Sequence, residues 1–289
     1  MLGDVDAGVE IEVVNLNALV AYAALEKDRR LRQLRTYIRF ARRDGYIDER
    51  FPGMVCFAVR YVRKHGFPGR RYAIGCAVQS LTREARAIAF GVLPAAEDLS
   101  IAFDVDLKNS IPSCCARLAR RLGLDEHCTV LMKYVEHVDE WKSAVAEYYE
   151  LTVDEAKRLI LKVFFGGAPP DENPMLWGLI RDVSTVRDAV LAEYLTTVFT
   201  SRPRPTITRF AYALFAEEDA LLRKLIHKIT ETMPTAHISA LIFDGCVVTF
   251  PSSEPTTEGD LDAVLESFAI DFAVTPTIKP WNVPDVEHA

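Results

Sequence analysis

The stretch ISALIFDGCVVTF, residues 238–250, decides the fold class of this chain. Two strongly apolar runs are joined by Asp244-Gly245, a dipeptide typical of two-residue β-hairpin turns. A second strand signal, SIAFDVDLKN at 100–109, alternates apolar residues with Asp104 and Asp106, so both carboxylates face the same side. These segments predict β-strands that carry carboxylates near their ends.

Helical patterns fill the sequence between these strands, at 112–122, 138–149, 153–165, 174–199 and 207–231. A long helix is predicted earlier, at 17–43, whereas MVCFAVRYVRK at 54–64 fits either a helix or a strand. The sequence therefore predicts an α+β fold in which strands flank a large helical insertion.

Length and composition indicate a globular protein, because 289 residues of which 49% are hydrophobic suffice for a sizeable core. The sequence has no uncharged apolar run long enough to span a membrane, and its acidic start, MLGDVDAGVE, differs from a basic signal peptide. We therefore expect an intracellular protein, cytoplasmic or nucleoid, with no membrane partner. The six cysteines form no CxxC pair and have no histidine at zinc-ligand spacing, so we expect buried free thiols.

Positive charge is concentrated in residues 26–86, which carry 16 Lys and Arg against 6 Asp and Glu. This local charge of +10, in a chain of net charge −7, indicates a polyanionic partner. Aromatic residues lie among these cations, as stacking or packing residues do in a nucleic-acid groove. Helical spacing sets four arginines on one face, opposite an apolar stripe: Arg32, Arg35, Arg39 and Arg42. A solvated basic helix has the same pattern, so both interpretations stay open.

The carboxylates at the strand ends suit a metal site. Asp244 lies between two apolar strands, where an unpaired carboxylate is costly unless water or a bound cation meets it. Asp106, with Asp104 beside it, ends another apolar strand, and oxygen ligands of this kind suit Mg²⁺. Two ions about 4 Å apart could activate a 3′ hydroxyl and stabilise a leaving pyrophosphate, which is nucleotidyl transfer. The spacing fits a structural Asp-Gly turn and a solvated strand end equally well.

The segment EAKRLILKVFFGG, residues 155–167, predicts a helix with a mixed face. Thr152 and Glu155 have the spacing of a capping box, so the helix should begin near residue 153 and end at the two glycines. One face sets an ammonium beside an apolar and aromatic shelf: Lys157, Leu161, Phe164 and Phe165. Such a shelf could hold a base and its phosphates, although an ordinary amphipathic helix fits the same residues.

Taken in order, these motifs resemble the family A DNA polymerases and the related phage-type single-subunit RNA polymerases. Those enzymes carry a helix with Lys and then Tyr-Gly eight and nine positions later, and Lys157 with Phe165-Gly166 has this spacing. Their two metal-binding motifs look like IAFDVDLKNS, with Asp106, and LIFDGCVV, with Asp244. The resemblance implies two Mg²⁺ ions, with Mn²⁺ as a possible substitute, held by Asp106 and Asp244 with Asp104 nearby.

The resemblance extends along most of the chain. The family's Gly-Arg and Asn-Leu-Gln-Asn segments have a counterpart in GRRYAIGCAVQSL at 69–81, and residues 260–289 look like its closing helix, strand and Asn-Trp tail. The resemblance implies a right-hand polymerase core at 69–289, with a palm at 69–150 and 232–289 and fingers at 151–231. Residues 1–68 would form a basic, helical, thumb-like region, and there is no room for an exonuclease domain.

Two groups of residues receive roles from this resemblance. Contacts to the incoming nucleotide are implied for residues of the mixed-face helix and for one position after the first metal-binding motif: Lys157, Arg158, Leu161, Phe165, Gly166 and Ile111. Contacts to nucleic acid are implied for Arg70, Gln79 and Arg86, besides the four arginines at 32–42. Ile111 stands where the DNA-polymerase relatives have the glutamate that excludes a ribose 2′ hydroxyl, so a moderate preference for deoxynucleotides is expected.

The chain departs from the family pattern at several positions. Phe243 and Gly245 replace the His and Glu that flank the second aspartate, Val153 replaces an arginine, and Phe165 lacks the usual tyrosine hydroxyl. The resemblance still implies a DNA polymerase, a template-dependent nucleotidyltransferase that extends a primer with deoxynucleotides. Its partners would be primer-template DNA or RNA, nucleoside triphosphates and accessory replication subunits. A primase or single-subunit RNA polymerase of the same fold, and a catalytically degenerate nucleic-acid-binding protein, are the alternatives.

Overall fold

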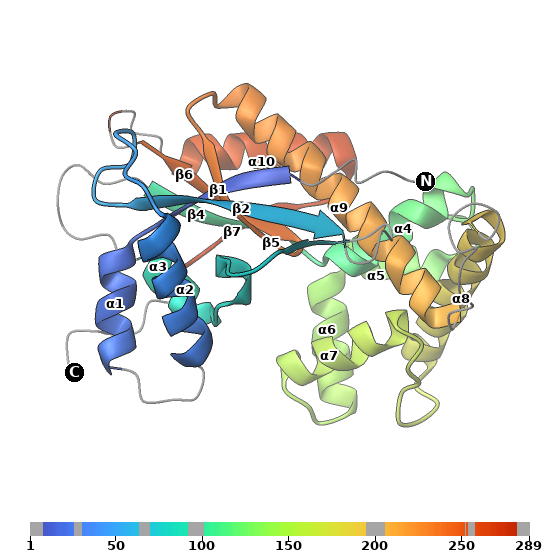
Figure 1. Cartoon of the computed structure of the whole chain (residues 1–289). Coiled ribbons are helices and arrows are strands. Elements are labelled where there is room, and N and C mark those ends of the chain that lie inside the picture. The colour runs from blue at the N-terminus through green and yellow to red at the C-terminus, as the bar shows by residue number, and fades with distance from the viewer. Residues whose placement is uncertain are drawn as a thin grey trace. The chain divides into compact units, whose positions relative to one another are not determined.

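The computed structural model describes residues 8–25, 31–63, 70–91, 101–194, 206–251, 253 and 258–281 (Figure 1). The fold is mixed α+β with antiparallel sheets, as the sequence predicts. Contacts divide the chain into two compact units. The first comprises Met1–Gly66, Arg70–Lys108 and Asp219–Ala289, and the second comprises Phe67–Gly69 and Asn109–Glu218.

A four-stranded antiparallel sheet forms one half of the first unit. Its strands lie in the order β5 (His237–Ile242), β6 (Gly245–Phe250), β4 (Ile101–Leu107) and β7 (Pro276–Lys279). All of β6 is buried, which explains its unbroken apolar sequence, whereas β4 alternates buried apolar residues with partly exposed aspartates. Helix α10 (Glu258–Phe272) packs beside β7 and buries Leu261, Val264, Leu265 and Phe268, which share one face.

A three-stranded antiparallel sheet forms the other half, in the order β1 (Gly8–Val14), β2 (Val55–Arg63) and β3 (Arg71–Ala73). It is accompanied by helices α1 (Leu16–Leu25), α2 (Leu31–Asp44) and α3 (Arg83–Gly91) and the 3₁₀ helix η2 (Val78–Ser80). Strand β1 also lies beside β5, where the Nε2 of His237 donates to the Ile11 carbonyl at 2.8 Å. Both sheets therefore belong to one unit.

The described part of segment 1–68 differs from the helical region that the sequence suggested. Segment 54–64 is a strand, β2, and it pairs along its length with β1, whose GVEIEVV sequence we had not identified as a strand. The predicted helix at 17–43 corresponds to two helices, α1 and α2. Pairing between segments that are distant in the chain decides this region, and local periodicity carries no record of it.

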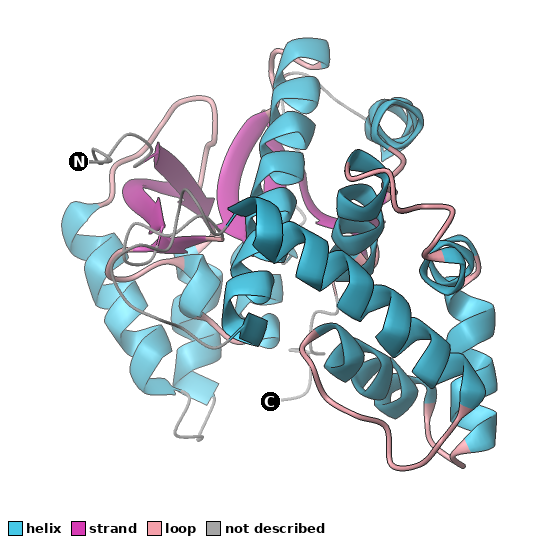
Figure 2. Ribbon diagram, turned by 90° about the vertical axis from the view of Figure 1, so that its right-hand side faces the viewer, coloured by secondary structure: helices cyan, strands magenta, loops and turns pink. Residues whose placement is uncertain are grey.

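All regular elements described in the second unit are helices (Figure 2). They are α4 (Ser110–Arg121), α5 (Thr129–Glu136), α6 (Val138–Tyr148), α7 (Val153–Phe164), α8 (Pro174–Tyr194) and the first half of α9 (Thr206–Thr232). Helix α5 was not predicted. Its first turn is held by Asp182 of α8, a buried carboxylate that accepts from the backbone N–H of Val130 and Leu131 at 2.8 and 3.1 Å.

The remaining structural predictions are confirmed within the described residues. The capping box of α7 is present, since Thr152 accepts from the Glu155 N–H and Glu155 accepts from the Thr152 N–H. All six cysteines are free, and all but Cys76 are buried. No helix in the described part of the chain is long and apolar enough to cross a membrane.

Candidate active site

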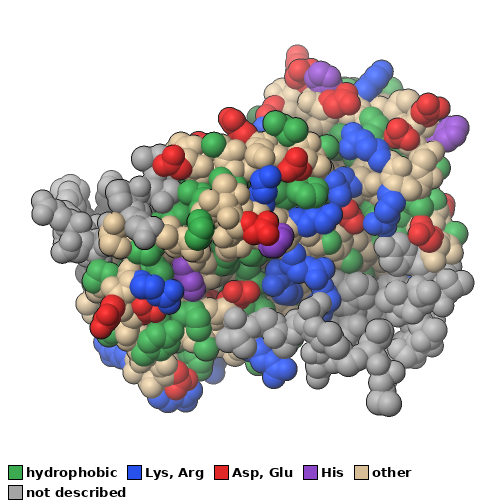
Figure 3. Space-filling view, turned by 90° about the horizontal axis from the view of Figure 1, so that it is seen from above, with side chains coloured by type: hydrophobic (Ala, Val, Ile, Leu, Met, Phe, Trp, Pro, Cys, Tyr) green, Lys and Arg blue, Asp and Glu red, His purple; other side chains and the backbone are tan. Residues whose placement is uncertain are grey.

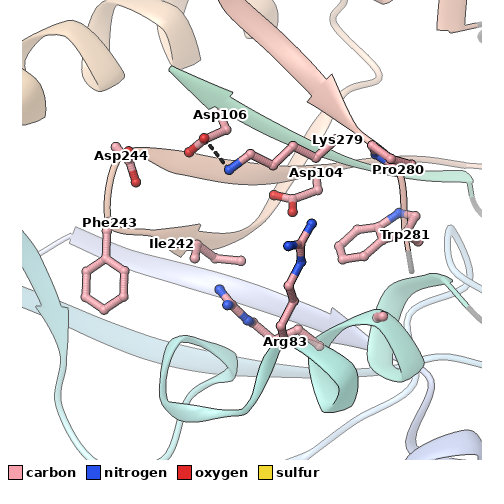
Figure 4. Close-up of a pocket in the computed structure, with 11 residues that line it drawn as sticks. Arg83, Asp104, Asp106, Ile242, Phe243, Asp244, Lys279, Pro280 and Trp281 are labelled. Atoms are coloured by element: carbon pink, nitrogen blue, oxygen red, sulfur yellow. Dashed lines mark ion pairs between the residues drawn. The ribbon is translucent and has the colours of Figure 1, made fainter. Parts of the chain in front are cut away.

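The register of the four-stranded sheet brings the carboxylates of two predicted motifs together. Asp106 of β4 pairs with Gly245 of β6, so Asp244 in the preceding turn lies next to it. The Leu107 N–H donates to the Asp244 carbonyl at 3.2 Å and fixes the turn against β4. Asp104 lies two residues earlier on the same side of β4. These carboxylates line a cavity of about 200 Å³ within the first unit (Figure 4).

The hairpin turn differs from the predicted one by a single residue. Strand β5 ends at Ile242 and β6 begins at Gly245, so Phe243 and Asp244 form the turn, not Asp244 and Gly245. Gly245 is required inside the strand, because a Cβ there would lie 2.4 Å from the Val105 carbonyl oxygen and 3.1 Å from the Asp106 Oδ1. The glycine thus permits close approach of the two carboxylate-bearing strands instead of supplying turn geometry.

Lys279 of β7 is a member of the site that sequence reasoning missed. It lies opposite Asp104 in the β4–β7 register, and its Nζ forms an ion pair with the Asp106 carboxylate (Figure 4). Alternation in β7 puts Lys279 and Thr277 on one side, but only the pairing with β4 reveals that this side faces the aspartates. Tertiary structure, not motif spacing, identifies this cation.

The electrostatics of the cavity favour a bound cation beside the aspartates. Burial raises the pKa of Asp106 to about 6, Asp244 raises it further, and the ion pair with Lys279 opposes both effects. Burial also raises the pKa of Asp104, against the lowering effects of Lys279 and Arg86. Asp104 and Asp106 are therefore costly to ionise here and gain from positive charge nearby.

Two arginines of α3 complete the cavity opposite the carboxylates. Arg83 and Arg86 line it, and Arg86 was among the residues expected to contact nucleic acid. Burial lowers the pKa of Arg86, while Asp104 raises it, and the buried Arg86 Nε has no hydrogen-bond partner among the described residues. Cations on one wall and carboxylates on another suit a ligand that presents phosphate and a metal ion together.

The donor set fits Mg²⁺ only as a partial coordination shell. Among the described residues, no group of three or more His, Cys, Asp or Glu side chains is close enough to hold a metal ion. Asp106 and Asp244 supply two carboxylates, and Mg²⁺ commonly takes one or two carboxylates and completes its shell with water and substrate phosphate. Their chemistry fits the ion, provided that Lys279 leaves Asp106.

The predicted nucleotide-binding residues of α7 lie in the second unit. Lys157 and Arg158 are exposed and Leu161 is half-buried, while Phe165 is exposed and lies 6.1 Å from the Phe215 ring. The other face of α7 forms the core of this unit: Ala156, Ile160, Val163 and Phe164. Phe164 therefore does not belong to the predicted shelf, because the helix turns its ring toward Tyr134. At Gly166, with φ 78°, a Cβ would collide with Ile207.

Ile111 also lies in the second unit, on α4, where only 6% of its surface is exposed. The residue before the helix, Asn109, adopts a left-handed conformation with φ 51°. Ser110 Oγ donates to Glu218 at 2.7 Å, which anchors the first turn of α4 in the interior. Ile111 is thus a buried wall residue, and its predicted role toward a sugar stays a prediction.

Gln79 is engaged inside the first unit. Its side-chain amide donates to the Arg71 and Leu241 carbonyls and accepts from the Ala73 N–H, at 3.1, 3.2 and 3.1 Å respectively. Gln79 thereby joins β3 to β5, directly before the turn that carries Asp244. The observed contacts give it a positioning role, while the predicted contact with a primer-template has no support in them. Arg70 lies over the Phe243 ring, with its Cζ 5.5 Å from the ring centroid.

The arginine stripe is exposed as predicted, and part of the remaining positive charge is balanced internally. The four arginines at 32, 35, 39 and 42 lie on the exposed face of α2, and Leu34, Tyr37, Ile38 and Ala41 are buried opposite. By contrast, Arg63 and Arg71 donate to the buried Asp219 at 2.9 and 2.8 Å. In Figure 3 described basic and acidic side chains are interspersed. Only part of the basic segment is therefore available to a polyanion.

Comparisons with known proteins add no relative. The sequence matches no model of a known protein family, and a search of curated proteins found no match either.

Proposed function

We propose that the chain is a template-dependent nucleotidyltransferase that extends a primer with deoxynucleotides by a two-metal-ion mechanism. The observation that carries this proposal is the meeting of Asp106 and Asp244 at one cavity, from two antiparallel strands whose motifs are distant in sequence. Such a pair on a sheet edge is the arrangement expected of a polymerase palm. The four-stranded sheet with α10 would be that palm, and the helical second unit would supply fingers.

The carboxylates would hold the metal ions. Asp106 and Asp244 offer oxygen ligands at the cavity, and burial makes Asp106 costly to ionise without a cation beside it. Bound there, Mg²⁺ would favour ionisation of a primer 3′ hydroxyl and stabilise charge on a leaving pyrophosphate. Lys279 would release Asp106 at this step and contact phosphate instead. Arg83 and Arg86 would bind phosphate oxygens from the opposite wall, and the buried Nε of Arg86 would then gain a partner.

The exposed cations of the helices would contact the substrates. Lys157, with Arg158, would neutralise the triphosphate of the incoming nucleotide beside Leu161, Phe165 and Gly166. The arginine stripe of α2 would bind the duplex backbone without reading its sequence, because guanidinium groups on an exposed helix face contact phosphates alike in every sequence.

One observation favours a second candidate, a nucleic-acid-binding protein that has lost catalysis. Lys279 already neutralises Asp106, and no group of three potential metal ligands occurs among the described residues. In such a protein the ion pair would be a permanent substitute for the metal. The retention of Asp244, whose charge makes the ionisation of Asp106 more costly, favours the catalytic proposal.

Primer extension distinguishes the two candidates. The purified chain is incubated with Mg²⁺ or Mn²⁺, DNA or RNA templates, with or without a primer, and with either deoxy- or ribonucleotides. We expect primer-dependent products with deoxynucleotides, and loss of at least about 90% of kcat in Asp106→Asn and in Asp244→Asn with nucleic-acid binding retained. Asp262→Asn, an exposed carboxylate of α10, is the control. Products without a primer would favour a primase, and no product under any condition would overturn the proposal.

A further inference from the structure

An exposed aromatic cluster lies beside the proposed metal site, and we call its members Arg70, Tyr72 and Phe243 the stacking platform. The rings of Tyr72 and Phe243 meet edge to face, with centroids 6.2 Å apart and an interplanar angle of 68°. The guanidinium of Arg70 lies over the Phe243 ring at 5.5 Å. Phe243 is 37% exposed and Tyr72 36% exposed. The platform thus presents aromatic surface to solvent within the first unit.

The backbone at Phe243 shows that a phenylalanine is an unfavourable choice for this turn. Phe243 is the first central residue of a two-residue hairpin turn and has φ 54°, in the left-handed region that favours glycine or asparagine. A bulky residue there is strained, and its ring gains little from burial because it stays exposed. Turn formation therefore does not account for this residue, whereas ligand binding would.

The platform lies directly beside the reacting groups of the proposed function. Phe243 precedes Asp244 in the chain and lines the same cavity as Asp104 and Asp106. Figure 4 shows its ring extending from the turn that carries Asp244. Any nucleic acid whose 3′ hydroxyl approached Asp106 and Asp244 would therefore bring its last base close to this ring.

We propose that the stacking platform binds the terminal base of the primer 3′ end by stacking, an inference that rests on the proposed nucleotidyl transfer. The chemistry is suitable because every base has a π-face, so an aromatic ring with an adjacent guanidinium binds bases without sequence preference. Arg70 keeps a positive charge at the platform, which suits a polyanion and disfavours an apolar protein partner. The stacking platform would hold the 3′ end in line with the carboxylates.

Fluorescence of 2-aminopurine tests this proposal without metal or nucleotide. The base is placed at the 3′ end of a primer annealed to a longer template, and a second duplex carries it at an internal position as a control. Binding of the parent chain should change the fluorescence of the terminal base more than that of the internal one. Phe243→Gly and Tyr72→Ala should weaken binding of the recessed duplex about 5- to 150-fold, the range expected for loss of one stacked base.

Three variants separate stacking from folding. Phe243→Gly relaxes the φ of 54° and should unfold at the same or a higher temperature, so weaker binding would not come from misfolding. Phe243→Leu keeps apolar volume without a π-face and should also lose the terminal signal. Tyr46→Ala removes another exposed aromatic of this unit, 46% exposed, and should bind as the parent does.

The possible outcomes distinguish this proposal from the proposed function. Parent-like binding and fluorescence in both Phe243 variants would overturn the platform, whether or not the chain extends primers. A platform-dependent terminal signal in a chain that makes no product with Mg²⁺ would retain the binding site and reject nucleotidyl transfer. In an active chain, Phe243→Gly should raise the KM for primer-template more than it lowers kcat, because stacking acts before the chemical step.

Discussion

Replacing the buried Glu12 by Gln should stabilise the first unit at neutral and alkaline pH. Glu12 of β1 is fully buried, and its carboxylate accepts from the hydroxyls of Tyr37 and Tyr61 at 3.0 and 2.9 Å. It also accepts from the Val78 N–H at 3.0 Å. A glutamine has nearly the same shape, its oxygen can accept from Val78, and its NH₂ can donate to a tyrosine hydroxyl. The substitution therefore removes the charge and keeps the network.

The pKa of Glu12 sets the magnitude and the sign. Burial raises this pKa from 4.5 to about 7, although the bonds from Val78, Tyr61 and Tyr37 lower it. Between pH 4.5 and about 7 the unfolded chain loses this proton while the folded chain keeps it, so stability falls as pH rises. Each pKa unit corresponds to about 1.4 kcal/mol, which gives a loss of about 3 kcal/mol that is complete above pH 7 or so.

Urea unfolding from pH 4 to pH 8, combined with hydrogen exchange of the β1 and β2 amides, measures this effect. The free energy of unfolding of the parent minus that of Glu12→Gln should become more negative by about 2–3 kcal/mol across this range. Glu266→Gln, an exposed residue of α10, serves as the control and should follow the parent. A pH-independent difference between Glu12→Gln and the parent would refute the assigned pKa, and destabilisation of Glu12→Gln at pH 8 would show that the network needs the charge.

Three further predictions concern the candidate site and its substrates. Lys279→Met should raise the pKa of Asp106 and lower the Mn²⁺ concentration needed for half-saturation at pH 8, measured by electron paramagnetic resonance, about 5- to 30-fold; an unchanged value would place the ion elsewhere. Gln at both Arg35 and Arg39 should flatten the slope of log K against log salt on duplex DNA by roughly one to two, about 0.9 per phosphate, whereas an equal slope would mean that these arginines are only solvated. Ile111→Ala should reduce a deoxynucleotide preference of roughly 5- to 150-fold in kcat/KM and destabilise the second unit by about 2–4 kcal/mol; lower stability with unchanged preference would leave Ile111 a core residue only.

Local signals in the sequence predicted several elements correctly. Thr152 and Glu155 specify the start of α7, because a capping box needs only two residues on neighbouring positions of one helical turn. The alternation around Asp104 and Asp106 specifies β4, since side chains along a strand face opposite sides in turn. The arginine stripe of α2 follows from helical period alone.

Prediction failed where distant segments compete with local preference. Asp244-Gly245 is a favourable turn sequence, yet Gly245 lies inside β6 because Val105 and Asp106 approach too closely for any side chain. The turn moves to Phe243, a residue that no turn preference would select. Strand β1 escaped notice because its pairing partner, β2, lies beyond two intervening helices in the chain.

The sequence by itself determined the α+β class, the helices and the two strands that carry Asp106 and Asp244, because propensity, capping and periodicity act over a few neighbouring residues. Only the tertiary structure decided that Lys279 pairs with Asp106, that Arg86 faces the carboxylates, and that Glu12 is enclosed by two tyrosines. Strand register and helix packing set these contacts, since burial makes a charge seek a partner wherever in the chain that partner lies.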